Sequence, residues 1–253
     1  MTGLAGRTVL VTGAGGGIGR GIALACAAAG AHVLVASRGS NGADVEREAR
    51  DRGHSARWVR CDVTAADDVR AAVAVALEHG QGLHAFVHNA TSGASSQPHR
   101  LEDVTPELWT DHAAVSLRAT HLCARAAFAP LAESRGSFVV MTSPAGIEGS
   151  AMLPLYATMK GALRGFAKSL AREWGPHGVT VNAVSPLGTS PAMTRAIEAD
   201  PAMLQRFAAR IPLGRLGDPE RDVGAAVALL LDPRAGYISG QTIGIDGGQF
   251  SSF

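Results

Sequence analysis

Seven short apolar runs alternate with helix-like stretches, and this order restricts the possible folds more than any other feature of the chain. The apolar runs are Thr8–Val11, His32–Ala36, Ala56–Arg60, Leu83–His88, Ser137–Thr142, Val179–Val184 and Thr242–Ile245. The helix-like stretches include Ile18–Ala29, Ala65–Glu78, Pro106–Phe128, Tyr156–Trp174 and Pro219–Leu231. Strands that alternate with helices pair in parallel through right-handed crossovers. We therefore predict an α/β fold, a Rossmann-like doubly wound parallel sheet of about seven strands with helices on both faces.

A glycine-rich segment, T-G-A-G-G-G-I-G over Thr12–Gly19, joins the first predicted strand to the first predicted helix. A pyrophosphate binds backbone N–H groups at a helix N-terminus, and a Cβ on that face would obstruct its approach. The segment departs from strict G-x-G-x-x-G spacing, so its place between strand and helix carries the interpretation. A flexible glycine turn is the alternative. The close approach is assigned to Gly13, Gly17 and Gly19, and Gly15 and Ile18 are placed in the same cofactor site.

The end of the second predicted strand, at Ser37 and Arg38, indicates which dinucleotide binds. An acidic residue there would bond to the adenosine ribose and repel a phosphate, whereas an arginine pairs with a 2′-phosphate. These two residues therefore favour NADP(H) over NAD(H). A solvated arginine on a loop is the alternative.

Tyr156 and Lys160 stand four residues apart in Y-A-T-M-K, in a chain with only two tyrosines and two lysines. On a helix this spacing places both side chains on one face. A free phenol has a pKa of about 10, and a nearby ammonium favours the phenolate, so we expect a lowered phenol pKa. Tyr156 is then a general acid in reduction and a general base in oxidation. A packed aromatic beside a solvated lysine is the alternative.

Ser143 follows the apolar run that ends in Thr142, just before turn residues. A hydroxyl at the carboxyl end of a central strand can hydrogen-bond a substrate carbonyl oxygen and orient it. We therefore include Ser143 in the catalytic site.

We find no repeat, charge block or low-complexity linker that would divide the chain, so residues 1–253 are expected to form a single dinucleotide-binding and catalytic domain. Residues 187–210 lie between a strand and the next secure helix. An excursion at the carboxyl ends of the strands is the usual place for a ligand-covering segment. We predict a substrate-covering lid over 187–210, with an ordinary surface helix pair as the alternative.

Charge and cysteine content exclude several classes of function. The 23 basic and 22 acidic residues leave a net charge of +1, which provides no electrostatic footprint for nucleic acid or an anionic membrane. Cys26, Cys61 and Cys123 form neither a disulfide framework nor a metal-ligand pattern, so we expect no metal and a reducing, cytoplasmic location. Glycines interrupt the apolar N-terminal run, and we expect no targeting or transmembrane segment.

Together these segments resemble the short-chain dehydrogenase/reductase family over nearly the whole chain. The matching stretches are T-G-A-G-G-G-I-G (Thr12–Gly19), C-D-V (Cys61–Val63), H-N-A (His88–Ala90), T-S-P-A-G (Thr142–Gly146), Y-A-T-M-K (Tyr156–Lys160), V-N-A-V-S-P (Val181–Pro186) and I-D-G-G (Ile245–Gly248). The resemblance implies that Lys160 bonds to the nicotinamide ribose while Tyr156 and Ser143 hold the substrate oxygen. It also implies a homo-oligomer, a tetramer or dimer assembled through long helices such as the one carrying Tyr156. The cofactor contacts that it adds are Asp62 and Val63 at the adenine, Asn89 and Ala90 in the cleft, and Pro186, Gly188 and Thr189 at the nicotinamide carboxamide.

The chain departs from the family pattern at four positions. Ser116 replaces an asparagine that anchors water in the proton relay behind the lysine, so we include Ser116 in the catalytic site and expect slower proton exchange. His88 and Thr91 replace an asparagine and a glycine at the cleft floor. Leu187 replaces a glycine in the nicotinamide loop.

The function predicted from these features is hydride transfer between NADP(H) and a small carbonyl or secondary alcohol, as in a carbonyl reductase or alcohol dehydrogenase. One alternative is a catalytically weak regulatory or scaffolding protein of the same fold. A second alternative is enoyl reduction, which the resemblance disfavours because related enoyl reductases separate their tyrosine and lysine more widely. Substrate choice is expected to depend on Ser92–Arg100, Ile147–Leu155 and Gly188–Arg210.

Overall fold

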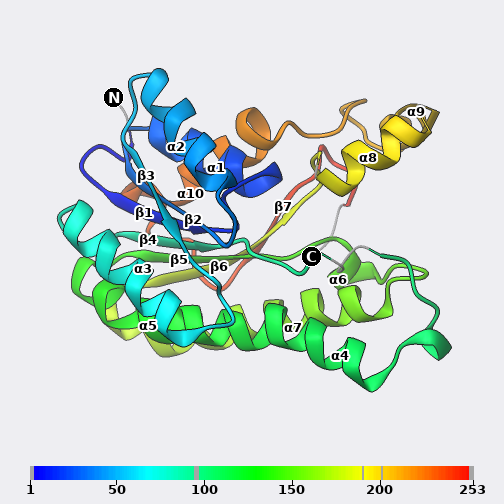
Figure 1. Cartoon of the computed structure of the whole chain (residues 1–253), viewed down its shortest axis with the longest axis horizontal. Coiled ribbons are helices and arrows are strands. Elements are labelled where there is room, and N and C mark those ends of the chain that lie inside the picture. Colours follow the sequence, from blue (N-terminus) through cyan, green and yellow to red (C-terminus); the bar gives the residue numbers. More distant parts are fainter. Residues whose placement is uncertain (1–2, 94–96, 190, 201, 251–253) are drawn as a thin grey trace.

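The computed structural model describes residues 3–93, 97–189, 191–200 and 202–250, and seven parallel strands form its sheet in the order β3-β2-β1-β4-β5-β6-β7 (Figure 1). The chain starts at β1 in the middle, builds one half outward to β3, and returns beside β1 to build the other. The predicted doubly wound parallel sheet is confirmed. The strands are β1 (Thr8–Thr12), β2 (His32–Ser37), β3 (Ala56–Arg60), β4 (Ala85–His88), β5 (Ser137–Met141), β6 (Thr180–Pro186) and β7 (Thr242–Ile245).

Helices cover both faces of the sheet (Figure 1). The α-helices are α1 (Gly17–Ala28), α2 (Asn41–Asp51), α3 (Ala66–His79), α4 (Pro106–Ala113), α5 (Ala119–Ser134), α6 (Ala145–Glu148), α7 (Pro154–Trp174), α8 (Pro191–Ala199), α9 (Ala202–Ala208) and α10 (Ala225–Leu230). Short 3₁₀ turns are η1 (Leu101–Asp103), η3 (Gly175–His177) and η5 (Pro233–Ala235), and two π-helical segments are η2 (Ala114–Arg118) and η4 (Pro219–Gly224). Helices α1, α2 and α10 lie on one face, and α3, α5 and α7 lie on the other.

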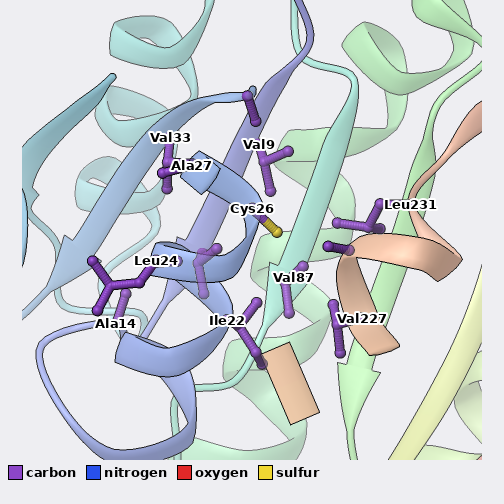
Figure 2. Close-up of a cluster of buried hydrophobic side chains, with 14 of the residues drawn as sticks. Val9, Ala14, Ile22, Leu24, Cys26, Ala27, Val33, Val87, Val227 and Leu231 are labelled. Atoms are coloured by element: carbon purple, nitrogen blue, oxygen red, sulfur yellow. The ribbon is translucent and has the colours of Figure 1, made fainter. Parts of the chain in front are cut away.

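Alternation along the strands divides the core into two layers, because successive side chains of a strand point to opposite faces. Val9 and Val11 pack beneath α1 and α10, whereas Leu10 packs beneath α3 and α5. Figure 2 shows the first layer, in which Ile22 of α1 and Val227 of α10 meet over the valines of the sheet. All these side chains are buried, so the central strands are apolar on both faces, as a covered parallel sheet requires.

The helix predicted over Pro106–Phe128 is interrupted, which corrects the sequence-based interpretation. Regular turns end at Ala113, η2 follows with π geometry, and α5 then extends to Ser134. Periodicity cannot reveal a single wide turn, because the apolar face continues through it. The stretch predicted over Pro219–Leu231 likewise begins as π-helical η4.

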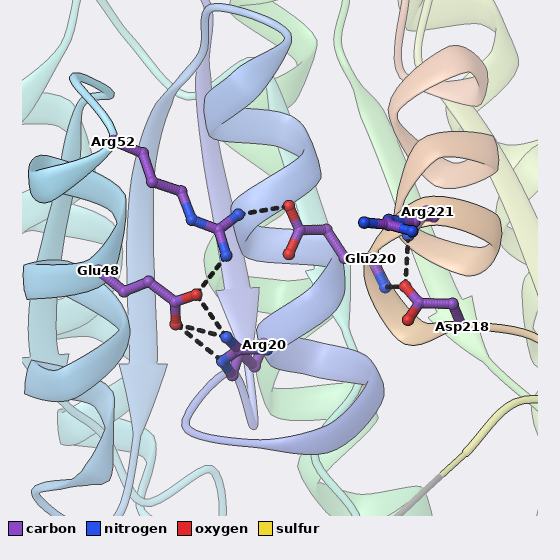
Figure 3. A network of polar contacts seen from close by, with 6 residues as sticks. All are labelled: Arg20, Glu48, Arg52, Asp218, Glu220 and Arg221. Carbon is purple, nitrogen blue, oxygen red and sulfur yellow. Dashed lines mark hydrogen bonds and ion pairs between the residues drawn. The ribbon is translucent and has the colours of Figure 1, made fainter.

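Helix α1 is held at close range by its neighbours. A Cβ on Gly21 would lie 2.2 Å from the Pro219 carbonyl, so only glycine lets α1 and η4 approach this closely. Arg20 of α1 pairs with Glu48 of α2 at 2.5 Å, and Arg52 bridges the same carboxylate to Glu220 of η4 at 2.6 Å (Figure 3). The helix that follows the glycine turn is therefore fixed to two other elements.

The described residues contain no helix that is both long enough and apolar enough to cross a membrane.

Candidate active site

Ser143, Tyr156 and Lys160 come together where β5 ends and α7 begins. Ser143 lies two residues beyond β5, and its hydroxyl hydrogen-bonds to the Tyr156 phenol in the first turns of α7. Gly146 of α6 makes this approach possible, since a Cβ there would lie 2.5 Å from the Lys160 carbonyl carbon. The sequence analysis placed Ser143 and Tyr156 in one site, and the fold brings them into contact.

Lys160 is a buried cation behind the phenol. Its side chain is only 5% exposed, and Nζ donates to the Met141 carbonyl at 2.8 Å. Nζ lies 5.7 Å from the centroid of the Tyr156 ring. Burial lowers the pKa of Lys160 to about 8, because desolvation penalises the charged form. The lysine backbone is fixed as well, since the Thr142 hydroxyl donates to its carbonyl at 2.7 Å.

The phenol of Tyr156 is not acidified in this arrangement. Burial raises its pKa above the ordinary value of about 10, and the hydrogen bond from Ser143 lowers it by less. The expectation that proximity to the ammonium would leave a lowered phenol pKa is therefore wrong for this structure. Sequence spacing places the lysine correctly but says nothing of how deeply both groups are buried.

Ser116 lies in the π-helical segment η2, which packs against α7. Its side chain is 5% exposed, and its carbonyl accepts a hydrogen bond from the Thr120 hydroxyl. The residue assigned to the proton relay is thus buried on an irregular turn beside the helix that carries Tyr156 and Lys160. A wide turn of this kind displaces backbone carbonyls from regular pairing.

His88 ends β4 and is buried next to Lys160. Its Nδ1 lies 3.0 Å from the Thr12 hydroxyl. The same hydroxyl oxygen accepts hydrogen bonds from the backbone amides of Asn89 and Ala90 at 3.2 and 3.3 Å. Desolvation, with a smaller contribution from the Lys160 charge, lowers the pKa of His88 to about 3. The imidazole is therefore neutral at physiological pH. The histidine substitution keeps the turn after β4 tied to β1 through Thr12.

The glycine turn leaves the N-terminus of α1 free of any side-chain cap. Gly13 and Gly17 have φ of +65° and +52°, a region that favours glycine. A Cβ on Gly13 would lie 2.8 Å from Cα of Ala90, and one on Gly19 would lie 2.3 Å from the Gly13 carbonyl oxygen. At Gly13 and Gly19, therefore, a Cβ would collide with the protein backbone. The sequence analysis had named only a collision with the pyrophosphate. Ile18 is partly buried against the layer beneath α1.

Asn41 contacts the glycine turn from α2, and the sequence analysis did not select it. It is the first residue of α2, and its Nδ2 donates to the Gly15 carbonyl at 2.7 Å. A Cβ on Gly15 would lie 2.5 Å from the amide of Asn41. The only sequence signal for this contact is an asparagine at the start of a helix, a pattern that normally indicates a helix cap.

The predicted adenosine end gathers Ser37, Arg38, Asp62 and Val63. The Ser37 hydroxyl donates to the Gly39 carbonyl at 2.8 Å and accepts from Trp58 Nε1 at 3.0 Å, so it is engaged within the chain. Arg38 is exposed, and no carboxylate in the described part of the chain pairs with it. Hydrogen bonds from Thr64 lower the pKa of Asp62, and the charge of Arg38 adds to this.

The loop after β6 runs beside Gly217. The Leu187 amide donates to the Ile245 carbonyl at 2.9 Å, and the Thr189 amide to the Gly217 carbonyl at 3.1 Å. Gly188 and Gly217 form an isolated parallel bridge. Leu187 is accommodated without breaking this pairing. The lid predicted over 187–210 contains α8 and α9, and its residues 190 and 201 lie outside the described residues, as do 94–96 of the Ser92–Arg100 segment.

Two histidines that the sequence analysis did not select line a crevice beside Tyr156. His112 lies on α4 and is 2% exposed, and His99 lies in the segment before η1. With nine histidines in the chain, neither had a pattern that set it apart.

Comparisons with known proteins match almost the entire chain. A family model described as enoyl-(acyl carrier protein) reductase matches residues 13–249. A 3-oxoacyl-[acyl-carrier-protein] reductase from Synechocystis sp. is 36% identical over 253 residues, which is 98% of each protein. A 2,5-dichloro-2,5-cyclohexadiene-1,4-diol dehydrogenase from Sphingobium indicum is 32% identical, again over 98% of each. The crystal structure of a 3-ketoacyl-(acyl-carrier-protein) reductase from Brucella melitensis with NADH superposes with a TM-score of 0.85 at 30% identity, covering 97% of this chain and 98% of that one.

Proposed function

Because this chain belongs to the short-chain dehydrogenase/reductase family, we propose that it transfers a hydride between NADP(H) and a carbonyl or secondary alcohol carbon, with Tyr156 as the general acid and base. The observation that carries the proposal is the partly buried phenol of Tyr156, which has the Ser143 hydroxyl beside it and Nζ of Lys160 5.7 Å from its ring. Ordinary packing of an aromatic residue does not require either partner.

The raised pKa of Tyr156 suits the reductive direction. A phenol that stays protonated at neutral pH can donate its proton to an oxygen that becomes basic as the carbonyl is reduced. In oxidation the phenolate oxygen of Tyr156 must accept the proton that leaves the alcohol hydroxyl, and the positive charge of Lys160 then favours the phenolate. Ser143 is placed to hold the substrate oxygen at the phenol.

A nicotinamide dinucleotide fits the residues present. The uncapped N-terminus of α1 offers backbone N–H groups to a pyrophosphate, and the space around Gly16 is open. When bound, the dinucleotide supplies or accepts the hydride. Asp62, Val63, Asn89 and Ala90 would line its adenine and central parts, and Pro186, Gly188 and Thr189 would meet the carboxamide.

The preference for NADP(H) over NAD(H) rests on Arg38. Its guanidinium is exposed just after β2, where a 2′-phosphate would be expected, and no described carboxylate lies within ion-pair distance of it, although Asp62 is near enough to feel its charge. A guanidinium pairs with a phosphate through charge-assisted hydrogen bonds. The Brucella melitensis structure carries NADH, so the choice in this chain depends on its own residues.

The decisive experiment compares the parent protein with Tyr156→Phe across a panel of ketones and secondary alcohols, following the absorbance of NADPH. We expect turnover to fall by a factor of at least about 100, because the proton transfer is lost, while the dissociation constant of NADPH stays within about twofold. Full activity in Tyr156→Phe would refute the role of the phenol. Tight cofactor binding with no turnover of any substrate by the parent protein would favour a regulatory or scaffolding role.

Three further properties belong to the same proposal. Residues 1–253 act as one catalytic domain in which α8 and α9, within 187–210, cover the substrate. The chain assembles as a homo-oligomer through its long helices, which sedimentation of the purified protein would test. All three cysteines are free and buried, and burial raises the pKa of Cys26 and Cys61 to about 12, which suits a reducing, cytoplasmic setting.

A further inference from the structure

His112 and His99 leave ring nitrogens without partners beside Tyr156. Both nitrogens of His112 and Nε2 of His99 are buried and make no hydrogen bond within the described part of the chain. A buried polar group without a partner costs free energy, so such groups in a folded protein call for an explanation. The two histidines come from separate elements and line the same crevice.

The crevice lies beside the reacting centre. Tyr156 lines it together with His99 and His112, and its remaining wall is mostly apolar, with Met152 and Leu155 among the residues. The His99 amide donates to the Met152 carbonyl at 2.7 Å, and Met152 has a φ of +64°, which a non-glycine residue rarely adopts. The backbone thus holds the His99 segment against the turn before α7, at some cost in strain.

Charge favours a neutral ligand at this position. Burial lowers the pKa of His112, and the neighbouring His99 lowers it further, against a smaller opposing effect of Asp111. No lysine or arginine lines the crevice among the described residues. A carboxylate there would be buried without a cation, which is costly. A neutral imidazole instead offers one donor and one acceptor, and a hydroxyl group offers the same pair in return.

We propose that His112 and His99 form a subsite for a second hydroxyl group of the substrate, on a carbon near the one that is oxidised or reduced. The substrate class is therefore diols and the corresponding hydroxy-ketones. This inference rests on the proposed function, because the reacting oxygen must be the one held at Tyr156. The crevice as it stands has no space for a water-sized group, so the hydroxyl enters when the side chain of Met152, which is 47% exposed, moves aside.

The test compares cyclohexane-1,2-diol with cyclohexanol, using NADP⁺ and the full-length protein. We expect the parent protein to prefer the diol in kcat/KM by about tenfold or more, the value of one or two neutral hydrogen bonds. His112→Phe keeps the ring and removes both nitrogens, and it should lower kcat/KM for the diol about tenfold while changing that for cyclohexanol less than about twofold. His112→Gln restores a donor and an acceptor and should recover most of the preference.

Two further variants keep the result interpretable. His99→Phe alters the less buried partner outside the regular helices, so it tests the subsite even if His112→Phe does not fold. His79→Phe makes the same change at the far end of α3, where Nε2 is also buried and unpartnered, and it should leave the preference unchanged. Equal kcat/KM for the two substrates in the parent protein, or a preference that survives in both His112→Phe and His99→Phe, overturns the subsite and leaves the proposed function standing. Absence of turnover with every alcohol and ketone overturns both.

Discussion

Nζ of Lys160 lies 5.7 Å from the centre of the Tyr156 ring, while its hydrogen bond goes to a carbonyl of β5. The lysine therefore donates to the backbone and not to the phenol, and its charge, which is itself expensive to bury, can reach the phenol only through space. This relationship makes Lys160 a residue that the proposed function requires and whose burial lowers the stability of the fold.

Replacement of Lys160 by methionine should stabilise the fold while abolishing turnover. The folded pKa of about 8 lies below the ordinary lysine value of 10.5, so between these values the unfolded chain binds more protons and the stability of the parent protein rises with pH. Below this window the parent protein carries the full penalty. We expect Lys160→Met to gain about 1 to 3 kcal/mol in free energy of unfolding near neutral pH, with the gain shrinking toward about pH 10. Urea unfolding at both pH values measures it, and a loss of stability at neutral pH would contradict the expectation.

Replacement of Arg38 by aspartate should reverse the cofactor preference. The variant loses a charge-assisted pair with the 2′-phosphate and gains a carboxylate that repels it, so we expect the NADPH:NADH ratio of dissociation constants to change by about 100-fold or more. Fluorescence titration of the purified protein measures both constants. Arg125→Asp makes the same change of charge on the exposed side of α5 and should leave the ratio within about twofold. Equal affinities in the parent protein would refute the proposed preference.

Alanine at Gly13 and at Gly16 should have opposite outcomes for stability. Gly13 has a φ of +65°, and a Cβ would collide with the backbone of Ala90, so Gly13→Ala should cost about 2 kcal/mol or more. Gly16 has an extended φ of −176° and nothing within 4 Å of the added atom, so Gly16→Ala should change the free energy of unfolding by less than about 1 kcal/mol. Denaturant unfolding of the two variants side by side checks the contrast, which would disappear if the turn were merely flexible.

Replacement of Ser116 by asparagine should speed proton exchange if the wide turn of η2 supports the relay. The longer amide can hold a water behind Lys160 more firmly than the serine hydroxyl, so we expect kcat to rise a few-fold with the KM for substrate unchanged. The solvent isotope effect on kcat should fall in parallel. A rise in KM with no change in kcat would instead indicate that Ser116 shapes the site without serving the relay. Ser169→Asn, on the exposed side of α7, is a suitable control.

The layered fold was predictable because the central strands are continuous apolar runs, and the covering helices repeat their apolar residues at the helical period of about 3.6. The parallel sheet covered on both faces and most strand boundaries followed from this alternation, whereas the strand order was not predicted. The interruption at Ala114–Arg118 was not predicted either, since a π turn leaves the apolar spacing intact. Motif spacing likewise placed Tyr156 and Lys160 together. The direction of the Tyr156 pKa shift was missed because it depends on burial, which only the packed structure defines.

The crevice histidines show a second limit of the sequence. His112 reads as a polar position within an amphipathic helix, and His99 as part of a loop. Their proximity arises only when α4 packs against α7 and the loop bonds to Met152. A contact between elements that are distant in the chain leaves no recognisable pattern in the local sequence.

The close contact of Gly21 with Pro219 also limits how the molecule can move. The contact with Gly21 fixes η4 to α1, and Gly217, which lies just before η4, is bridged to Gly188. The segment from Gly188 to Gly217 is therefore anchored at both of its ends. Any swing of α8 and α9 over a substrate must be absorbed inside that span. Opening and closing would then leave the glycine turn before α1 in its place, so that, on the proposed function, an exchange of substrate need not release the dinucleotide.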